Sequence, residues 1–430
     1  MTAAPLFSSL NAQSLVGLLS ILVLCWGLSE NRWRFPWRLL AGALAVQLGL
    51  LLLFFGFPPA QAVLGGLSAA VEGLSTASQT GAQFVFGYLA GGTQPFDASA
   101  AGAPYIFAFR VLPVIPVICA LSALLWYWGV LRFLAKGFGI VFERVLGMRG
   151  PTALATAATI FMGQVEGPIL IRAYLEKLTR SEIFTLMAVG MTCVSGSAMV
   201  AYAAILKGVL PDAAAHVFTA SVISAPAGVL LSQILAPPEK TAALDKTALE
   251  GEQNYQSSID AIMSGTAMGL QVVLSIAATL IVFVALVTMA NGALSLGPRF
   301  GGEPLTVQRG LELFLRPLSW AMGVPWQETG VAGHLLAQKL VLTEFTAFFD
   351  LSRLKPEQLS ERARLIMTYA LCGFANIGSV GVTGAGFGVI APNRRSEILA
   401  MLWRALLVGF LATCFTAALV GALPWRFFAS

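Results

Sequence analysis

Long hydrophobic runs separated by short polar segments form the main pattern of this chain. Runs without any charged residue cover 39–71, 183–206, 261–298, 365–393 and 405–425. A helix that crosses the hydrocarbon core of a bilayer needs about 20 mostly apolar residues, and each run reaches that length. The pattern predicts about eight membrane-spanning helices, near residues 13–30, 36–56, 105–131, 182–207, 214–235, 265–290, 365–391 and 399–422. We therefore expect an all-α polytopic membrane protein.

Two further apolar stretches, 150–178 and about 320–350, are interrupted by polar and charged residues. Each is long enough for two half-length helices. Irregular backbone at membrane depth is tolerated only inside protein or beside a cavity. These stretches therefore predict two helical hairpins that enter the bilayer and return on the same side.

The two halves of the chain repeat one arrangement. In each half a glutamate of the hairpin, Glu166 or Glu344, precedes a span whose centre is polar and contains glycine. These centres are Cys193–Ala198 and Gly373–Gly381. Broken helices at matching places in two halves are typical of the binding site of a secondary transporter, and we expect the halves to form an inverted repeat.

The connecting segments complete the predicted organisation. Residues 58–92 favour an interfacial or scaffold helix followed by a loop, and 133–147 favour an amphipathic helix in the membrane plane. We divide the chain into N-terminal spans and an interfacial helix (1–104), a scaffold span and in-plane helix (105–149), a first hairpin repeat (150–235), a cytoplasmic loop (236–264), a scaffold span and connector (265–319), and a second hairpin repeat with the last span (320–430).

Composition and charge support a membrane protein. Hydrophobic residues make up 57% of the 430 and charged residues 11%, whereas a soluble domain carries about a quarter charged residues. The net charge of +5 does not indicate nucleic-acid binding, because lysine and arginine collect at the ends of hydrophobic runs. The positive-inside rule places loops 30–38 and 132–150 in the cytoplasm and both termini outside the inner membrane, although the basic segment 353–364 disagrees. Residues 15–28 are interpreted as a first span rather than a signal peptide.

The five cysteines lie in apolar segments without CxxC spacing, and the two histidines share no ligand spacing. We therefore expect neither disulfides nor a structural metal, and no cofactor.

The two hairpin glutamates are the strongest functional signal. A charged side chain at the bilayer centre costs about 2.5–3.5 kcal/mol on insertion scales, so such residues usually serve a function. A structural ion pair with Arg172 or Lys339 is the alternative interpretation. The polar residues near the two breaks carry hydroxyl and amide groups, which suit a neutral polyhydroxylated solute: Gln164, Ser195, Ser197, Asn376 and Ser379.

Three motifs in register resemble those of the concentrative nucleoside transporter family in its bacterial, eight-span form. They are GQVEGP at 163–168, KLVLTEFTAF at 339–348 and CGFANIGSVG at 372–381. The resemblance extends from about residue 105 to 422. It implies a homotrimer in which each protomer imports nucleosides by an elevator-like movement of the hairpin-bearing part.

The resemblance also implies roles for individual residues. Gln164 and Glu166 would face the nucleobase, and Phe374 would line the base side. Ribose hydroxyls would bind Glu344, Asn376 and Ser379. Val165 and Ala198 complete the implied substrate site. Departures from the family pattern occur at Val165, where Thr or Ser is usual, at Thr343, where Asn is usual, and at Gly378, where Ser is usual.

The coupling ion is predicted from the same resemblance. In sodium-coupled members an Asn side chain, a Ser hydroxyl and backbone carbonyls hold the ion, and the matching positions here are Thr159, Met162, Cys193 and Val194. Sodium is a hard cation that prefers oxygen ligands, and a thiol is a poor substitute. We therefore favour proton coupling through Glu344 or Glu166, with sodium as the alternative.

The sequence thus predicts a cation-coupled nucleoside symporter. Open alternatives are a transporter of a nucleobase, modified nucleoside or sugar derivative, a passive channel, and a membrane-embedded enzyme that uses the paired glutamates.

Overall fold

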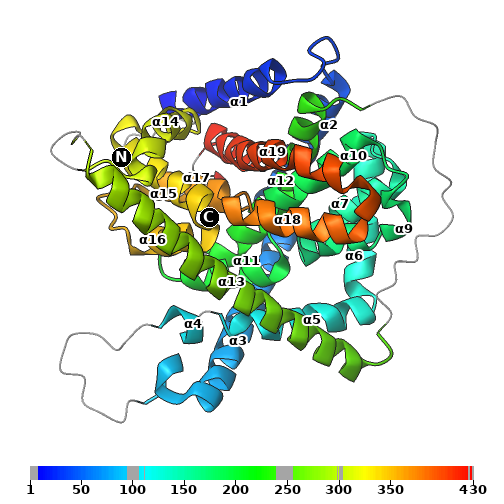
Figure 1. Cartoon of the computed structure of the whole chain (residues 1–430), viewed down its shortest axis with the longest axis vertical. Helices are drawn as coiled ribbons and strands as arrows, with labels where there is room; N and C mark the ends of the chain where they lie inside the picture. Colours follow the sequence, from blue (N-terminus) through cyan, green and yellow to red (C-terminus); the bar gives the residue numbers. More distant parts are fainter. Residues whose placement is uncertain are drawn as a thin grey trace.

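The computed structural model describes residues 8–93, 106–110, 112–238, 255–297, 299, 304–424 and 427–428, and within these ranges all regular structure is helical (Figure 1). The helices are α1 (Ser9–Gly27), α2 (Trp37–Gly56), α3 (Pro58–Phe86), η1 (Gly87–Ala90), α4 (Phe107–Arg110), α5 (Val114–Tyr127), α6 (Val130–Leu146), α7 (Gly150–Met162), α8 (Glu166–Ile169), α9 (Arg172–Leu175), α10 (Arg180–Thr192), α11 (Gly196–Ile205), α12 (Ala213–Leu235), α13 (Ser258–Ser295), α14 (Val307–Ala321), η2 (Trp326–Glu328), α15 (Thr329–Val341), α16 (Glu344–Arg353), α17 (Glu361–Leu371), α18 (Ile377–Ile390), η3 (Pro392–Arg394) and α19 (Arg395–Ala422).

The predicted spans correspond to helices in the structure. Among the described residues, seven helical stretches are long and apolar enough to cross a membrane: Ser9–Gly27, Trp37–Gly56, Ala108–Tyr127, Arg180–Ile205, Ala213–Leu235, Ser258–Ala278 and Pro392–Ala422. The eighth predicted span, 365–391, is divided between α17 and α18. The interfacial or scaffold helix predicted in 58–92 corresponds to α3, and a helix, α6, is also present at the predicted 133–147. Of the predicted loop 236–264, residues 239–254 lie outside the described ranges, and α13 begins within the loop, at Ser258.

Both predicted hairpins are present. The first consists of α7, a turn at residues 163–165, and the short helices α8 and α9. Gly163 allows that turn, since its φ of 129° is a conformation that side-chain-bearing residues rarely adopt. The second hairpin joins α15 to α16. Each hairpin is followed by a broken helix, α10–α11 or α17–α18, and then by one long helix, α12 or α19. The same order of elements therefore occurs twice.

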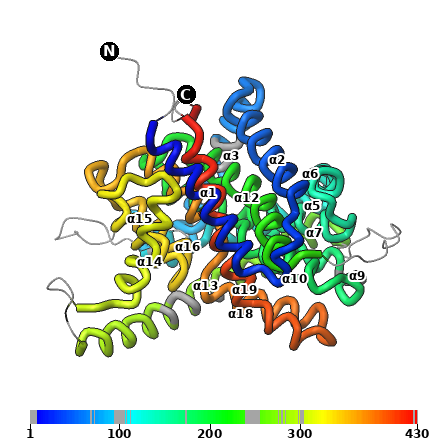
Figure 2. Tube along the Cα trace, turned by 90° about the horizontal axis from the view of Figure 1, so that it is seen from above, coloured from blue at the N-terminus to red at the C-terminus, as the bar shows by residue number. Residues whose placement is uncertain are grey.

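Three stretches form the buried centre of the molecule. The apolar stretches of α10–α11, α12 and α19 are 83%, 89% and 94% buried, whereas that of α13 is only 18% buried. α5 and α13 pack against each other at one edge of the molecule (Figure 1). α1 runs beside α19 (Figure 2) and also contacts α14. The outer helices thus enclose a core of broken and long helices.

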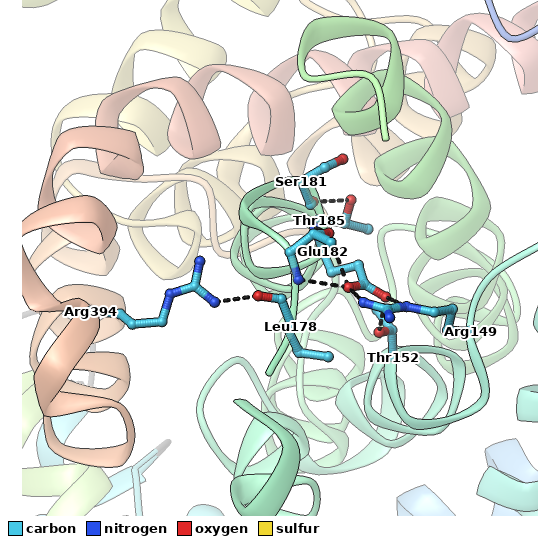
Figure 3. Close-up of polar contacts among 8 residues, drawn as sticks. Arg149, Thr152, Leu178, Ser181, Glu182, Thr185 and Arg394 are labelled. Atoms are coloured by element: carbon cyan, nitrogen blue, oxygen red, sulfur yellow. Dashed lines mark hydrogen bonds and ion pairs between the residues drawn. The ribbon is translucent and has the colours of Figure 1, made fainter. Parts of the chain in front are cut away.

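Polar contacts hold the base of each hairpin to the helix that follows it. Arg149, which precedes α7, points at Glu182 in the first turn of α10 and forms an ion pair with it (Figure 3). Glu182 also accepts hydrogen bonds from Thr152 and from the backbone N–H of Thr179, at 3.1 and 2.8 Å. These contacts close the first hairpin at its base.

The second hairpin has an equivalent contact. The carboxylate of Glu328, just before α15, accepts from the N–H and the hydroxyl of Ser360 at 3.1 and 2.8 Å. Ser360 caps α17. In each half, polar contacts therefore join the start of the hairpin to the start of the broken helix that follows it. The repeat includes these contacts as well as the order of the helices.

A third polar cluster links the loop between α1 and α2 to the core. Glu30 forms ion pairs with Arg180 at the start of α10 and with Arg404 in α19. The hydrogen bond from Arg180 is the largest of the effects that hold the pKa of Glu30 below its ordinary value.

This cluster predicts a pH-dependent contribution to stability. Because the pKa of Glu30 is lower in the folded protein, the contribution is present above the unfolded-state pKa and is lost as the pH falls through the folded one. Near pH 6 we expect Glu30→Gln to melt about 1–3 °C below the native protein, a small effect because the pair is partly exposed. The difference should shrink as the pH falls below the unfolded-state pKa of Glu30, and thermal unfolding of detergent-solubilised protein measures it. An equal difference at every pH would contradict this assignment.

Close helix packing gives a second prediction about stability. A methyl group added to Gly17 of α1 would collide with the backbone carbonyl of Ala321 in α14, whereas one added to Gly49 of α2 would meet nothing within 4 Å. Gly17→Ala should therefore cost about 1–3 kcal/mol and lower the melting temperature. Gly49→Ala, the matched control, should leave it unchanged or slightly higher. Equal melting temperatures for the two variants would show that α1 does not pack this closely.

Candidate functional site

The second hairpin places a buried carboxylate against two donors from other helices. Thr343 caps α16, so Glu344 occupies the first helical position, where only 4% of it is exposed. Its Oε1 accepts from the hydroxyl of Tyr202 in α11, and its Oε2 accepts from the Nδ2 of Asn376, both at 2.7 Å. Each oxygen of the carboxylate therefore has one side-chain donor.

The side-chain amide of Asn376 makes two hydrogen bonds at the break between α17 and α18. Its Oδ1 accepts the N–H of Ser379 at 2.8 Å and so caps α18, while its Nδ2 donates to Glu344. Because the amide oxygen is engaged with the helix, the amide nitrogen must face the carboxylate. The N-terminus of α18 also carries a partial positive charge that favours a nearby carboxylate. The predicted residues Glu344, Asn376 and Ser379 thus form one cluster.

The turn of the first hairpin lies against the same helix, α18. The hydroxyl of Thr383 donates to Oε1 of Gln164 at 3.3 Å. Val165 packs so closely on Gly386 that an added Cβ there would lie 2.6 Å from a Val165 methyl carbon. α18 therefore contacts the first hairpin along one part of its length and the second hairpin at its start.

Glu166 has a different environment from Glu344. It is partly buried, and its Oε2 accepts the backbone N–H of Val165 at 3.3 Å. It lines a cavity of about 50 Å³ together with Cys119 and Ser122 of α5, Met162 of α7, Ser197 of α11, Tyr255, Met268 of α13 and four apolar or aromatic neighbours. Glu166 thus lies where the first hairpin meets the α5–α13 pair.

The two glutamates flank one helix. Ser197 lines the cavity of Glu166, and Tyr202, five residues later in α11, donates to Glu344. Five residues of α-helix span about 7.5 Å along the axis. The structure therefore brings the two halves of the predicted substrate site to the same short helix.

The two helix breaks also meet. The N–H of Phe374 donates to the carbonyl of Cys193 at 3.4 Å, which joins the break of α17–α18 to that of α10–α11. Phe374 is partly buried. Ala198 is buried in the first turn of α11, where its N–H donates to the capping hydroxyl of Ser195 at 3.4 Å. All predicted substrate-site residues therefore lie at the two hairpin turns or at the two breaks.

Residues predicted to bind the coupling ion make hydrogen bonds within the protein. The hydroxyl of Thr159 donates to the carbonyl of Ala155 at 2.8 Å, and the thiol of Cys193 points to the carbonyl of Ser221 at 3.6 Å. The hydroxyl of Ser221 donates to the carbonyl of Val194 at 3.1 Å. Met162 lines the cavity of Glu166.

Sequence reasoning missed three residues that organise the site: Tyr202, Ser221 and Thr383. Each lies in a helix that is apolar overall, and each is almost fully buried. Their hydroxyl groups within uncharged runs were the available signal, but nothing in the local sequence separates them from other buried hydroxyls. Lys339, proposed above as an ion-pair partner, donates instead to the carbonyl of Ala370 and the hydroxyl of Thr413, both at 2.8 Å.

Two hairpins and two broken helices that gather carboxylates and amides in a membrane-spanning core define a secondary transporter. Comparison with known proteins also indicates a transporter. Family models described as the C-terminus and N-terminus of Na+ dependent nucleoside transporters match residues 216–421 and 16–89, and one described as nucleoside recognition matches 108–209.

Individual relatives match over nearly the whole chain. The nucleoside permease NupC of Helicobacter pylori is 32% identical, over 97% of this chain and 98% of its own length. The structure of CNTnw in an inward-facing, substrate-bound state is 33% identical, with a TM-score of 0.87 and 98% of each chain covered. A CNTnw variant in an outward-facing state is 34% identical, with a TM-score of 0.88 over 98% of each chain.

The chain therefore belongs to the concentrative nucleoside transporter family. Its members are membrane transporters rather than enzymes, and this chain is a multi-pass helical membrane protein.

Proposed function

We propose that this protein is a cation-coupled symporter that imports nucleosides across the inner membrane. The observation that carries the proposal is the contact of Glu344 with Asn376 and Tyr202 beside the meeting point of both helix breaks. A buried carboxylate that keeps free lone pairs accepts hydrogen bonds from sugar hydroxyls. In this site Glu344, Asn376 and Ser379 bind the ribose.

The nucleobase lies towards the first hairpin. Gln164 and Glu166 offer amide and carboxylate groups to its polar edge, and Val165 and Ala198 contribute apolar surface. Phe374 lines the base side. The closeness of Gln164 to Thr383 in α18, the helix that Asn376 caps, supports a single pocket that holds both parts of the cargo.

The transport movement is of the elevator type. α5 and α13 form the scaffold with the N-terminal spans, and residues 150–235 and 320–430 form the moving part. The close packing of Gly265 and Gly269 in α13 on the backbone of α5 supports a rigid scaffold pair, because an added Cβ would lie 2.6 or 2.5 Å from α5 backbone atoms. Relatives in inward-facing and outward-facing states support alternating access. The protein acts as a homotrimer with both termini outside.

We favour the proton as the coupling ion. Thr159 and Cys193 replace the side-chain ligands of a sodium site, and the carbonyl of Val194 already accepts from Ser221. Glu166 or Glu344 carries the proton. The family description favours sodium instead, so the choice of ion requires a direct test.

The substrate site is tested by Glu344→Gln. Removal of the charge weakens hydrogen bonds to the ribose hydroxyls, so uridine uptake into proteoliposomes at low concentration should fall at least about tenfold. The exposed Glu357→Gln is the matched control and should transport normally. Near-native uptake by Glu344→Gln would remove this residue from the site. Competition by adenosine but not by ribose or uracil is expected, and the reverse result would favour a different cargo.

The coupling ion is tested by varying sodium and pH independently. With proton coupling, uptake rises as the external pH falls and is unchanged when choline replaces sodium. Thr159→Asn combined with Cys193→Ser restores the amide and hydroxyl oxygens that sodium-coupled members carry at these positions and should make uptake depend on sodium. Loss of native uptake in choline would contradict proton coupling. A double variant that ignores sodium would contradict the assignment of these two positions.

A further inference from the structure

The position of Tyr202 is fixed by packing of its ring as well as by its hydrogen bond to Glu344. The side chain is fully buried in α11. Its ring stacks on Phe348 with centroids 4.6 Å apart, and the ring of Phe345 packs against it edge to face with centroids 4.8 Å apart. Both phenylalanines belong to α16, the helix that begins with Glu344. The tyrosine hydroxyl therefore has little freedom to leave the carboxylate.

The fixed position of the Tyr202 hydroxyl affects how the carboxylate of Glu344 can accept further hydrogen bonds. Each carboxylate oxygen has two lone pairs. Tyr202 donates to one oxygen and Asn376 to the other, both at 2.7 Å. Neither side chain uses the second lone pair of the oxygen that it contacts. A carboxylate that accepts one further hydrogen bond at each oxygen matches the two neighbouring hydroxyls of a ribose.

We propose that Tyr202 is a positioning residue that fixes the carboxylate of Glu344 for a pair of adjacent sugar hydroxyls, and so sets the preference for ribonucleosides over deoxynucleosides. The proposal rests on the proposed function, because it takes Glu344 as the ribose ligand. Tyr202 itself does not touch the cargo. Without its hydroxyl, the carboxylate keeps the Asn376 contact but rotates about it, and the hydroxyl bound at Oε1 loses its partner.

The test is Tyr202→Phe, which removes one oxygen atom and keeps the stacked ring. KM and kcat are measured in proteoliposomes for uridine, 2′-deoxyuridine and 3′-deoxyuridine. We expect the KM of uridine to rise about tenfold, as loss of a hydrogen bond to a charged group predicts, with little change in kcat. The KM of the deoxynucleoside that lacks the hydroxyl at Oε1 should rise much less. The variant therefore discriminates less between uridine and that substrate.

Two further variants keep the test decisive. Tyr369→Phe is the matched control, since Tyr369 is equally buried and its hydroxyl contacts His216 at 3.2 Å, and it should leave all three KM values unchanged. Phe348→Leu removes the stacked ring and keeps the hydroxyl, so it should shift KM in the same substrate order by a smaller factor. If a variant transports too slowly, the rise in melting temperature with each nucleoside gives its affinity.

The possible results distinguish failure of the positioning role of Tyr202 from failure of the proposed transport function. Unchanged KM values in Tyr202→Phe, or an equal rise for all three nucleosides, would overturn the positioning role while leaving the transport function intact. If the native protein takes up none of the three nucleosides, the proposed function fails, and the role of Tyr202 fails with it.

Discussion

The structure depends on one constraint: two helices are interrupted inside a membrane-spanning core, and their free backbone groups must find partners within the protein. Each unsatisfied group would cost several kcal/mol there. The breaks satisfy part of this need in each other, through the N–H of Phe374 and the carbonyl of Cys193. Ser221 supplies further contacts to Val194. Because the two breaks supply hydrogen-bond partners to each other, the polar residues of both halves lie close together at the breaks.

The caps at these breaks contribute to the site as well as to the fold. Asn376 ends the interruption of one helix with its oxygen and holds Glu344 with its nitrogen. Ser195 caps α11 and also contacts the hydroxyl of Ser197, which lines the cavity of Glu166. The same side chains therefore end the helix breaks and build the candidate site. Tyr202 differs from them, because it contacts the carboxylate of Glu344 without capping a helix.

The sequence predicted the spans, both hairpins and both breaks, because hydrophobic length, interruption by polar residues and glycine are local properties of the chain. The breaks are shorter than the polar centres 193–198 and 373–381 that predict them, because α11 resumes at Gly196 and α18 at Ile377. A capping Ser or Asn restarts a helix at once, whatever small residues follow. Tyr202 and Thr383 could not be predicted, since their roles depend on which helices pack together, and an isolated hydroxyl in an apolar helix gives no indication of its partner.

The two glutamates, which resemble each other in the sequence, are not equivalent in the fold. Glu344 is enclosed between α11 and α18, and both of its oxygens already have donors from those helices. Glu166 borders a cavity that α5 and α13 help to line, so its surroundings include the two helices that pair at the edge of the molecule. The contacts of Glu344 therefore lie within the hairpins and broken helices, whereas the surroundings of Glu166 extend to the α5–α13 pair.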